Sequence, residues 1–363
     1  MAFIENKINR IFDANLNRGI EGLRVIEEIA RFILDNKKLQ NKIKGIRHRF
    51  LQLGKDTFAA LPASNRIHAV ADKRDSENDV GGESVTSHEV KRQNIYSIIQ
   101  SNISRAAESA RVFEEFSKLE SSKLPALWKK IRFEIYSFEK ELISSFVRNE
   151  MKSRLHKIGL YCVIDAAFIA GRNIEKIAKE MIKGGTKIIQ YRDKSSMDRD
   201  FVGNSRKLQR ICYDSDVIFI INDRVDVAYI VNADGVHLGQ DDMPVSEARK
   251  ILGQEKIIGK SCENRRQLIE AIKENIDYIG LSGIFKTDTK KEQAVAGVEL
   301  IKTARHISGS VPLIAIGGIN KANINTVLKY KPDGICMISA IMKSYDIQKT
   351  TSLFSRIVNK KLK

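Results

Sequence analysis

The chain has 363 residues, of which 42% are hydrophobic, and it carries a formal net charge of +17. This length predicts two or more domains, and the positive charge favours anionic ligands. The basic residues are spread along the chain without an arginine-rich tail, which argues against a nucleic-acid partner. Because no signal-peptide-like segment opens the chain and no apolar run approaches about 18 residues, we expect a cytoplasmic protein with no membrane partner.

Residues 1–150 are predicted to form an all-α helical domain. Apolar residues recur at helical spacing in IEGLRVIEEIARFIL (20–34), and strand alternation is absent. The stretch ANLNRGIEGLRVIEE (14–28) returns as SNISRAAESARVFEE (101–115), and LQNKIKGIRHRF from Leu39 resembles LPALWKKIRFEI from Leu124. This internal repeat predicts a duplicated helical hairpin that packs into a four-helix bundle.

The polar residues of the repeat support two interpretations. They are Asn15, Arg18, Glu21 and Arg24 in the first copy and Asn102, Arg105, Glu108 and Arg111 in the second. Spacings of three place them on one helix surface, where they would form structural ion pairs. Alternatively, the two arginine clusters hold an anion near Arg47, His48 and residues 74–82.

Residues 151–363 show a different pattern, in which short apolar runs alternate with amphipathic stretches. The runs cover residues 158–165, 186–194, 217–223, 234–239, 256–261, 277–282, 312–318 and 333–340. A segment with helical spacing follows each run. This order predicts a (β/α)8 TIM barrel. A doubly wound sheet is the alternative, but its first strand would be followed by a glycine-rich turn.

Four cysteines lie far apart in the sequence and form no CxxC pair. They are Cys162, Cys212, Cys262 and Cys336. A zinc site or a disulfide framework would need closer spacing or an oxidising compartment. We therefore expect buried free thiols.

Polar residues follow most of the predicted strands, at the end of the barrel where active sites lie. They are Gln190–Lys194, Asn222, Asp223, Gln240–Asp242, Ser261, Thr287–Lys290, Gly317, Gly318 and Ser339. Two carboxylates beside basic side chains suit Mg²⁺ bound to a diphosphate, and the glycine pair suits a monophosphate cradle. We expect two phosphorylated small molecules here, with a loop at Thr287–Lys290 that closes over the diphosphate.

The barrel half resembles thiamine phosphate synthase. The matching stretches are QYRDK (190–194), IND (221–223), ADGVHLGQDD (233–242), GKS (259–261), GLSGIFKTDTK (280–290), AIGGI (315–319) and MISAI (337–341). The resemblance implies a transferase of thiamine biosynthesis. It would join 4-amino-2-methyl-5-(diphosphooxymethyl)pyrimidine to a thiazole monophosphate and release thiamine phosphate and diphosphate.

The resemblance also implies roles for single residues. Gln190, Tyr191, Arg192, Asp193, Lys194, Asn222, Ser261 and Lys290 would contact the pyrimidine diphosphate. Thr287, Asp288, Thr289, Gly318, Ile338 and Ser339 would lie by the thiazole phosphate, and Asp223 and Asp242 would hold Mg²⁺. Arg192, Lys194 and Lys290 would be catalytic, because they neutralise the departing diphosphate.

The chain departs from the family pattern at three places. Glu263 stands where the family has histidine, Ser282-Gly283 where it has Gly-Pro, and Lys286 where it has proline. A related barrel, the thiazole tautomerase, shares the fold, but it generally lacks the full diphosphate and metal set that this chain retains.

The helical half resembles domains fused ahead of thiamine phosphate synthases and linked to hydroxymethylpyrimidine phosphate kinase activity. A structural or dimerisation module is the alternative function of this half. The sequence leaves a homo-oligomer open.

Overall fold

The structure is a computed structural model of the chain. It describes residues 2–60, 92, 94–119, 121–155, 158–287 and 295–362. The chain divides into two compact units, Met1–Phe146 and Val147–Lys363. The boundary falls inside helix α5 (Leu124–Leu155), slightly before the predicted division at residue 150. Among the residues that the structure describes, no helix is long and apolar enough to cross a membrane.

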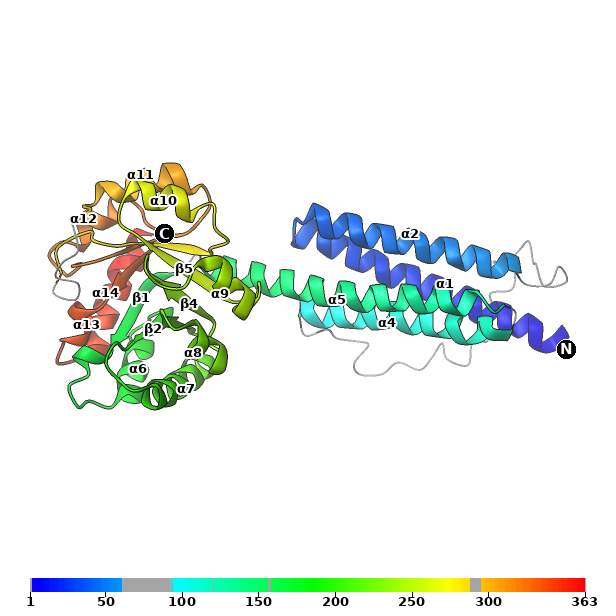
Figure 1. Cartoon of the computed structure of the whole chain (residues 1–363), viewed down its shortest axis with the longest axis horizontal. Helices are drawn as coiled ribbons and strands as arrows, with labels where there is room; N and C mark the ends of the chain where they lie inside the picture. Colours follow the sequence, from blue (N-terminus) through cyan, green and yellow to red (C-terminus); the bar gives the residue numbers. More distant parts are fainter. Residues whose placement is uncertain are drawn as a thin grey trace. The chain divides into compact units, whose positions relative to one another are not determined.

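The first unit is made of long helices, coloured blue to green in Figure 1. They are α1 (Ala2–Glu28), α2 (Lys37–Ala60), α4 (Ile95–Phe116) and α5, with a π-helical turn η1 (Ile29–Ile33) after α1 and a 3-10 turn η4 (Ser117–Leu119) after α4. Helix α1 packs against both α2 and α4. The predicted all-α domain, built from two helical hairpins, is confirmed.

Aromatic side chains fill the core of the helical unit. The ring of Phe12 stacks on Phe113 with 4.8 Å between centroids, and Phe113 stacks on Trp128 at 4.2 Å. The indole Nε1 of Trp128 donates a 2.9 Å hydrogen bond to the Thr57 hydroxyl, so the one polar atom of this buried ring is satisfied. The core therefore joins side chains from all four long helices.

The repeat places the same ion-pair network in each hairpin. The two sets are Arg24–Glu27–Arg47 and Arg111–Glu114–Arg132. In each set a buried glutamate receives an arginine from its own helix and another from the partner helix of the hairpin. Arg24 and Arg111 therefore form the ion pairs that the structural interpretation predicts, and the anion-binding alternative stays a prediction. Among the described residues, no ion pair is recorded between Arg18 and Glu21 or between Arg105 and Glu108.

The second unit is a closed barrel in which each strand pairs in parallel with the next, from β1 to β8 and back to β1. The strands are β1 (Gly159–Asp165), β2 (Ile188–Arg192), β3 (Ile218–Asn222), β4 (Gly235–Leu238), β5 (Ile257–Cys262), β6 (Tyr278–Leu281), β7 (Leu313–Ile316) and β8 (Gly334–Met337). The predicted (β/α)8 barrel is confirmed.

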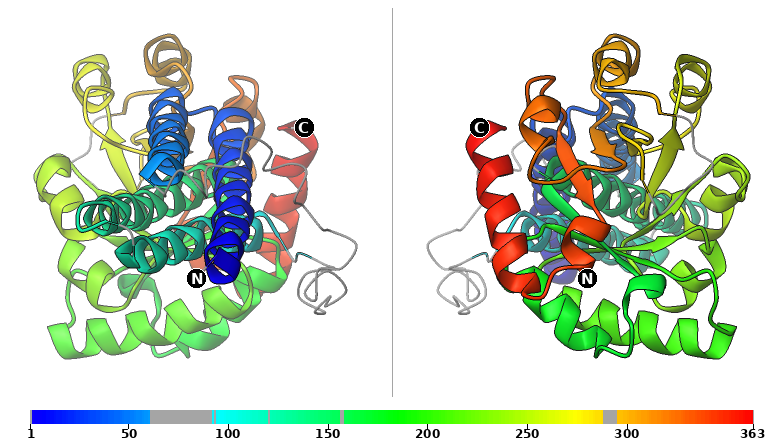
Figure 2. Two further views of the ribbon diagram at one scale, coloured as in Figure 1. Left: turned by 90° about the vertical axis from the view of Figure 1, so that its right-hand side faces the viewer. Right: turned by 90° about the vertical axis from the view of Figure 1, so that its left-hand side faces the viewer.

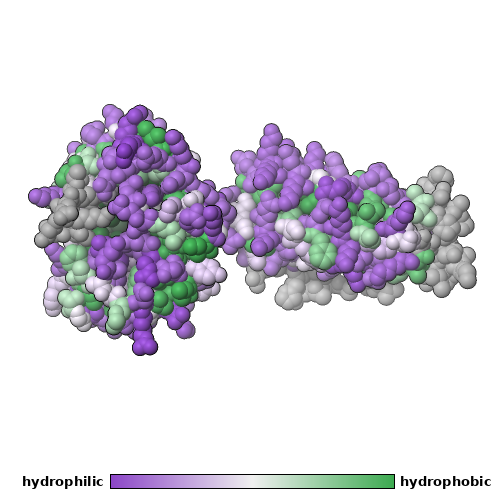
Figure 3. Space-filling view, viewed as in Figure 1, coloured by the Kyte–Doolittle hydropathy of each residue, from purple (hydrophilic) through white to green (hydrophobic). Residues whose placement is uncertain are grey.

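Helices surround the strands on the outside, as Figure 2 shows. They are α6 (Ile174–Lys183), α7 (Asp198–Asp214), α8 (Val225–Ile230), α9 (Val245–Leu252), α10 (Arg265–Ala271), α11 (Glu299–Ser308), α12 (Ile324–Leu328), α13 (Ser339–Met342) and α14 (Ile347–Lys361), with a 3-10 turn η5 (Ala166–Phe168) after β1. The side of the molecule seen in Figure 3 is mostly hydrophilic, with small hydrophobic patches.

Strand β1 shows why the strands read as unbroken apolar runs in the sequence. Leu160, Cys162 and Ile164 face the surrounding helices, whereas Tyr161 and Val163 face the barrel interior. Both faces of a parallel barrel strand are buried, so both carry apolar residues. All four cysteines are buried and free, as predicted.

The last turns of α5 cover the end of the barrel where the strands begin. Leu155 is fully buried in the interior cluster, and Met151 packs against the same cluster. Arg148 makes a 3.4 Å ion pair with Asp277, which directly precedes β6. Asp277 also receives the buried guanidinium of Arg249. This end of the barrel is therefore closed by apolar packing and a buried ion pair.

Candidate active site

A cavity of about 80 Å³ lies at the other end of the barrel, among the carboxyl ends of the strands. It is lined by Tyr161, Gln190, Arg192, Asn222, His237, Ser261, Tyr278, Gly280, Ser282, Thr287, Ile314, Ile316, Gly317, Gly318, Ile319, Cys336, Met337, Ile338 and Ser339. Most of the residues predicted to bind substrate are in this lining. Among the predicted residues in the lining, Gln190 and Ser339 are the farthest apart in the sequence, at 149 positions, and the barrel brings them to one cavity.

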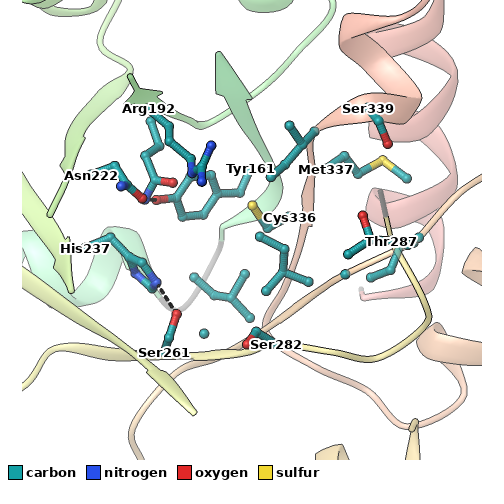
Figure 4. A pocket seen from close by; sticks show the side chains of 18 of the residues that line it. Tyr161, Arg192, Asn222, His237, Ser261, Ser282, Thr287, Cys336, Met337 and Ser339 are labelled. Atoms are coloured by element: carbon teal, nitrogen blue, oxygen red, sulfur yellow. Dashed lines mark hydrogen bonds between the residues drawn. The ribbon is translucent and has the colours of Figure 1, made fainter. Parts of the chain in front are cut away.

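One side of the cavity carries nitrogen donors from neighbouring strands β2 and β3. Arg192 and Asn222 are the last residues of their strands, and Figure 4 shows them near each other. The Arg192 guanidinium donates a 2.7 Å hydrogen bond to the buried carboxylate of Asp165 at the end of β1. This pair holds the guanidinium in place, so a cationic group is fixed at the cavity before any anion arrives.

A chain of hydrogen bonds crosses the floor of the cavity. The Gln190 side-chain amide donates to the Tyr161 hydroxyl at 3.0 Å, and the hydroxyls of Tyr161 and Tyr278 share a bond of 3.1 Å. Tyr278 and the Nδ1 atom of His237 are 2.8 Å apart, and His237 Nε2 lies 2.8 Å from the Ser261 hydroxyl, which Figure 4 marks with a dashed line. Five side chains from five strands therefore form one network.

The direction of this chain follows from its first member. Because the Gln190 amide donates to the Tyr161 hydroxyl, this hydroxyl can donate to Tyr278. The Tyr278 hydroxyl can then donate to Nδ1 of His237. The His237 tautomer that is consistent with this order has its proton on Nε2 and donates to Ser261. This order leaves the Ser261 hydroxyl able to donate into the cavity.

Burial keeps the tyrosine hydroxyls of this chain protonated. Burial raises the pKa of Tyr161 and of Tyr278 well above the usual range. The imidazole fits here because residue 280 is glycine, where an added Cβ would stand 2.9 Å from His237 Cε1. The imidazole therefore lies against Gly280 and stacks on the ring of Tyr278, with 5.4 Å between centroids.

Two carboxylates stand beside the cavity on the loops after β3 and β4. Asp223 takes a left-handed backbone conformation, with φ 61°, and its side chain accepts from the Lys194 ammonium. Asp242 accepts a 2.6 Å hydrogen bond from the Gly239 amide. Burial, and then the neighbouring Asp223 carboxyl, raise the pKa of Asp242. The two predicted metal ligands therefore lie close enough to interact.

The opposite side of the cavity carries hydroxyl and backbone groups. Figure 4 shows Thr287 and Ser339 on this side, away from Arg192. The backbone at Gly318 has φ 61°, and a Cβ there would stand 2.4 Å from the Lys286 carbonyl oxygen. Only glycine fits such a position. The chain segments after β6 and β7 therefore meet closely here, as a phosphate cradle of backbone amides requires.

Two predicted substrate-binding residues direct their side chains elsewhere. The Tyr191 side chain lies in the outer core, and its hydroxyl donates to Asp193 at 2.8 Å. Burial raises the pKa of the Asp193 carboxyl, but bonds from Ser196, Ser195 and Tyr191 outweigh this and lower it to about 2. These side chains therefore shape the loop after β2, and their role in substrate binding stays a prediction.

The remaining predicted residues lie at the rim of the cavity, outside the described residues or within strands. Lys194 contacts Asp223 at the rim and does not line the cavity. Asp288, Thr289 and Lys290 lie outside the described residues. Five predicted residues lie within the strands, as the apolar runs 186–194, 217–223 and 256–261 predict, and not in the loops after them: Gln190, Tyr191, Arg192, Asn222 and Ser261.

Sequence reasoning missed three polar groups of the cavity, Tyr161, His237 and Tyr278, and also Asp165, which holds Arg192. The first three face inward from within a strand, and Asp165 ends β1. Alternation along each strand is the signal that could have found them, because every second residue faces the interior.

The structure also gives Glu263 a partner. The Ser282 hydroxyl donates a 3.3 Å hydrogen bond to the Glu263 carboxylate, and Ser282 lines the cavity. Both residues are departures from the family pattern. The extra carboxylate is therefore bonded to the hydroxyl of the other departing residue.

Comparisons with known proteins agree with this geometry. Residues 160–341 match the family Thiamine monophosphate synthase, and residues 10–141 match the ThiD2 family. The chain is 35% identical to the thiamine-phosphate synthase of Synechocystis sp. over 96% of both chains, and 37% identical to that of Prochlorococcus marinus subsp. pastoris over 94% of this chain and 92% of the relative. A solved structure of thiamine phosphate pyrophosphorylase from Pyrococcus furiosus is 36% identical, with a TM-score of 0.53, and covers 58% of this chain and 99% of that one. With relatives this similar over nearly its whole length, the chain belongs to the thiamine-phosphate synthase family.

Proposed function

We propose that the barrel joins 4-amino-2-methyl-5-(diphosphooxymethyl)pyrimidine to a thiazole monophosphate, giving thiamine phosphate and diphosphate. The observation that carries this proposal is the division of the cavity. Cationic and amide donors (Arg192, Asn222) lie on one side, and Thr287 and Ser339 lie on the other. Two anionic substrates that must meet would need such a pair of subsites.

The reaction needs charge neutralisation more than acid–base catalysis. The bond between the pyrimidine methylene carbon and the diphosphate oxygen breaks, and its electron pair leaves with the diphosphate. The thiazole nitrogen then supplies the pair for the new carbon–nitrogen bond. Arg192, held by Asp165, would stabilise the growing charge on the leaving oxygen. The floor of Gln190 and Ser261 would orient the pyrimidine ring.

Mg²⁺ is the cofactor that the donor set favours. The Lys194 ammonium already lies against Asp223, so this carboxylate is placed to accept a cation, and the Gly239 amide orients Asp242. Among the described residues there is no group of three or more metal-ligating side chains. Two carboxylates suit magnesium, which completes its coordination with phosphate oxygens and water. When bound, Mg²⁺ would supply charge stabilisation for the diphosphate.

The test is direct. Purified chain is incubated with both phosphorylated substrates and Mg²⁺, and thiamine phosphate is measured by chromatography. Product formation that stops when Mg²⁺ is chelated supports the proposal. Folded protein that yields no product under these conditions would exclude it.

A second function is favoured for the helical unit by its match to the ThiD2 family over residues 10–141. We propose that this unit phosphorylates hydroxymethylpyrimidine phosphate and so makes the substrate of the barrel. The full chain is incubated with this monophosphate and ATP, with the thiazole phosphate left out. Accumulation of the pyrimidine diphosphate supports the proposal, and its absence leaves the helical unit with a structural role.

A further inference from the structure

The turn between α1 and α2 holds a polar cavity that the barrel chemistry does not use. It has a volume of about 580 Å³ and is lined by charged and amide side chains, among them Arg24, Arg31, Lys37, Lys44 and Arg47. Cavities of about 300–1,000 Å³ are typical of small-molecule sites. The number of cations indicates an anionic ligand.

Only part of this positive charge is neutralised by the protein. Glu27 accepts hydrogen bonds from Arg47 at 2.8 Å and from Gln40 at 3.2 Å, and it also pairs with Arg24. Burial raises the pKa of Glu27, but the bonds from Arg47 and Gln40 and the charge of Arg24 outweigh this and lower it. Glu27 is therefore ionised and already engaged.

The other three cations of the cavity lack such partners. Within the described parts of the chain, no ion pair is recorded for Arg31, Lys37 or Lys44, and Arg31 lies over the ring of Phe32 with 4.6 Å to its centroid. Five cations and two carboxylates, Glu27 and Asp35, line the cavity, so positive charge is in excess and these three cations repel one another. An anion bound between them would remove this repulsion.

The backbone at this turn is also unusual. Helix α1 does not end in regular α-helical geometry but continues as the π-turn Ile29–Ile33, and Asp35 has a left-handed φ of 46°. The Asn36 amide reaches back to the Ala30 carbonyl at 3.0 Å. π-turns are rare and are frequently found at functional sites. A widened helix end brings Arg31 to the cavity that Asp35 and Asn36 also line.

The second hairpin of the repeat is an internal comparison, because it keeps the ion-pair network but pairs the cation that corresponds to Arg31. Glu114 corresponds to Glu27 and is held by two arginines in the same way. Lys118, which corresponds to Arg31, pairs with Glu115 at 2.8 Å. Pro125 corresponds to Gln40. The ion-pair network alone therefore explains the shared glutamates, whereas Arg31, which has no recorded ion pair among the described residues, and the π-turn belong to the first hairpin.

We propose that the cavity at the α1–α2 turn binds the phosphoryl groups of a small phosphorylated metabolite. The proposal extends the phosphorylation suggested for the helical unit, since both a nucleoside triphosphate and hydroxymethylpyrimidine phosphate carry such groups. A binding site can exist without phosphoryl transfer. The two proposals can therefore fail separately.

The only tryptophan of the chain supplies the assay. Trp128 is buried in the helical core, so its fluorescence follows the unfolding of this unit and not that of the barrel. The full chain is heated with increasing ATP in one series and hydroxymethylpyrimidine phosphate in another, with potassium chloride at matched ionic strength as the control. A ligand at about 100 times its dissociation constant should raise the Trp128 transition by about 5–10 °C.

Two variants of the cavity and one matched control locate the site. In Arg31→Met and Lys44→Met, the rise should fall to less than half of the wild-type rise, each measured against the variant's own unliganded transition. Lys129 occupies the position of Lys44 in the second hairpin and is similarly exposed, and it lines a separate groove between α2 and α5. Lys129→Met should therefore retain the full rise.

The outcomes separate the possibilities. A rise with either ligand that the cavity variants lose supports the site and identifies which compound fills it. No rise with either ligand, or an equal loss in Lys129→Met, overturns the proposal. If the rise is present but no pyrimidine diphosphate forms with ATP, the anion site stands and the phosphorylation proposed for the helical unit fails.

Discussion

Replacing His237 with phenylalanine tests whether the hydrogen-bond chain under the cavity assists the reaction. The substitution keeps a flat ring but removes both nitrogens, so the hydroxyls of Tyr278 and Ser261 lose their 2.8 Å partners. Because Tyr278 keeps its 3.1 Å bond to Tyr161 and Ser261 borders the cavity, the loss of these two bonds should cost about 1–3 kcal/mol of stability. Ser261 would also lose the bond that directs its proton to the cavity, which is worth about 1 kcal/mol.

The kinetic consequence is therefore modest and specific. We expect kcat/KM for the pyrimidine diphosphate to fall about tenfold, with no comparable change in KM for the thiazole phosphate. His237→Gln can place an amide near the Nε2 position and should recover most of the loss, whereas Tyr278→Phe should resemble His237→Phe. The measurements are steady-state kinetics for each substrate and denaturant unfolding of each variant.

Two results would refute this reasoning. The first is a His237→Phe enzyme that loses stability but keeps wild-type kcat/KM, because the chain would then be only a scaffold. The second is an equal loss for both substrates, which would indicate general disorder of the cavity. Failure of His237→Gln to improve on phenylalanine would remove the role given to the Nε2 proton.

Three further predictions concern the rest of the chain. Asp242→Ala should raise the Mg²⁺ concentration needed for half-maximal activity. A near-wild-type rate that does not depend on the Mg²⁺ concentration would contradict the role of Asp242 as a metal ligand. Asp277→Ala should lower the free energy of unfolding by about 3–5 kcal/mol, because it leaves the buried Arg249 guanidinium without its counter-ion; a loss under about 1 kcal/mol in urea titration would disprove this. Lys290→Ala should lower kcat about a hundred- to thousandfold and Lys291→Ala hardly at all, so equal single-turnover rates would count against a leaving-group role.

The barrel could be predicted from the sequence because its signals are local and repeated. Each strand is a short run buried on both faces, as Leu160 to Ile164 show, and each run is followed by a helix. The duplicated hairpin was equally visible, because whole stretches of sequence recur. Such patterns depend only on spacing along the chain.

The floor of the cavity could not be predicted in the same way. His237 and Tyr278 look like ordinary members of buried strands, and their contact across 41 positions depends on the closed order of the strands. Arg192 was found from its motif, but its partner Asp165 was not, because the bond joins two strand ends. Side-chain directions also escaped the sequence, as Tyr191 shows by facing the outer helices.

The helix that covers the lower end of the barrel has a consequence for how the two halves can be separated. Residues 147–155 come before the first strand, yet Leu155 completes the bottom layer of the interior and Arg148 reaches Asp277. A protein that starts at Gly159 would lack this lid and would expose Tyr161 and its neighbours to water. A stable barrel fragment must therefore keep part of α5. The domain boundary for such a fragment lies before residue 147 and not at the start of β1.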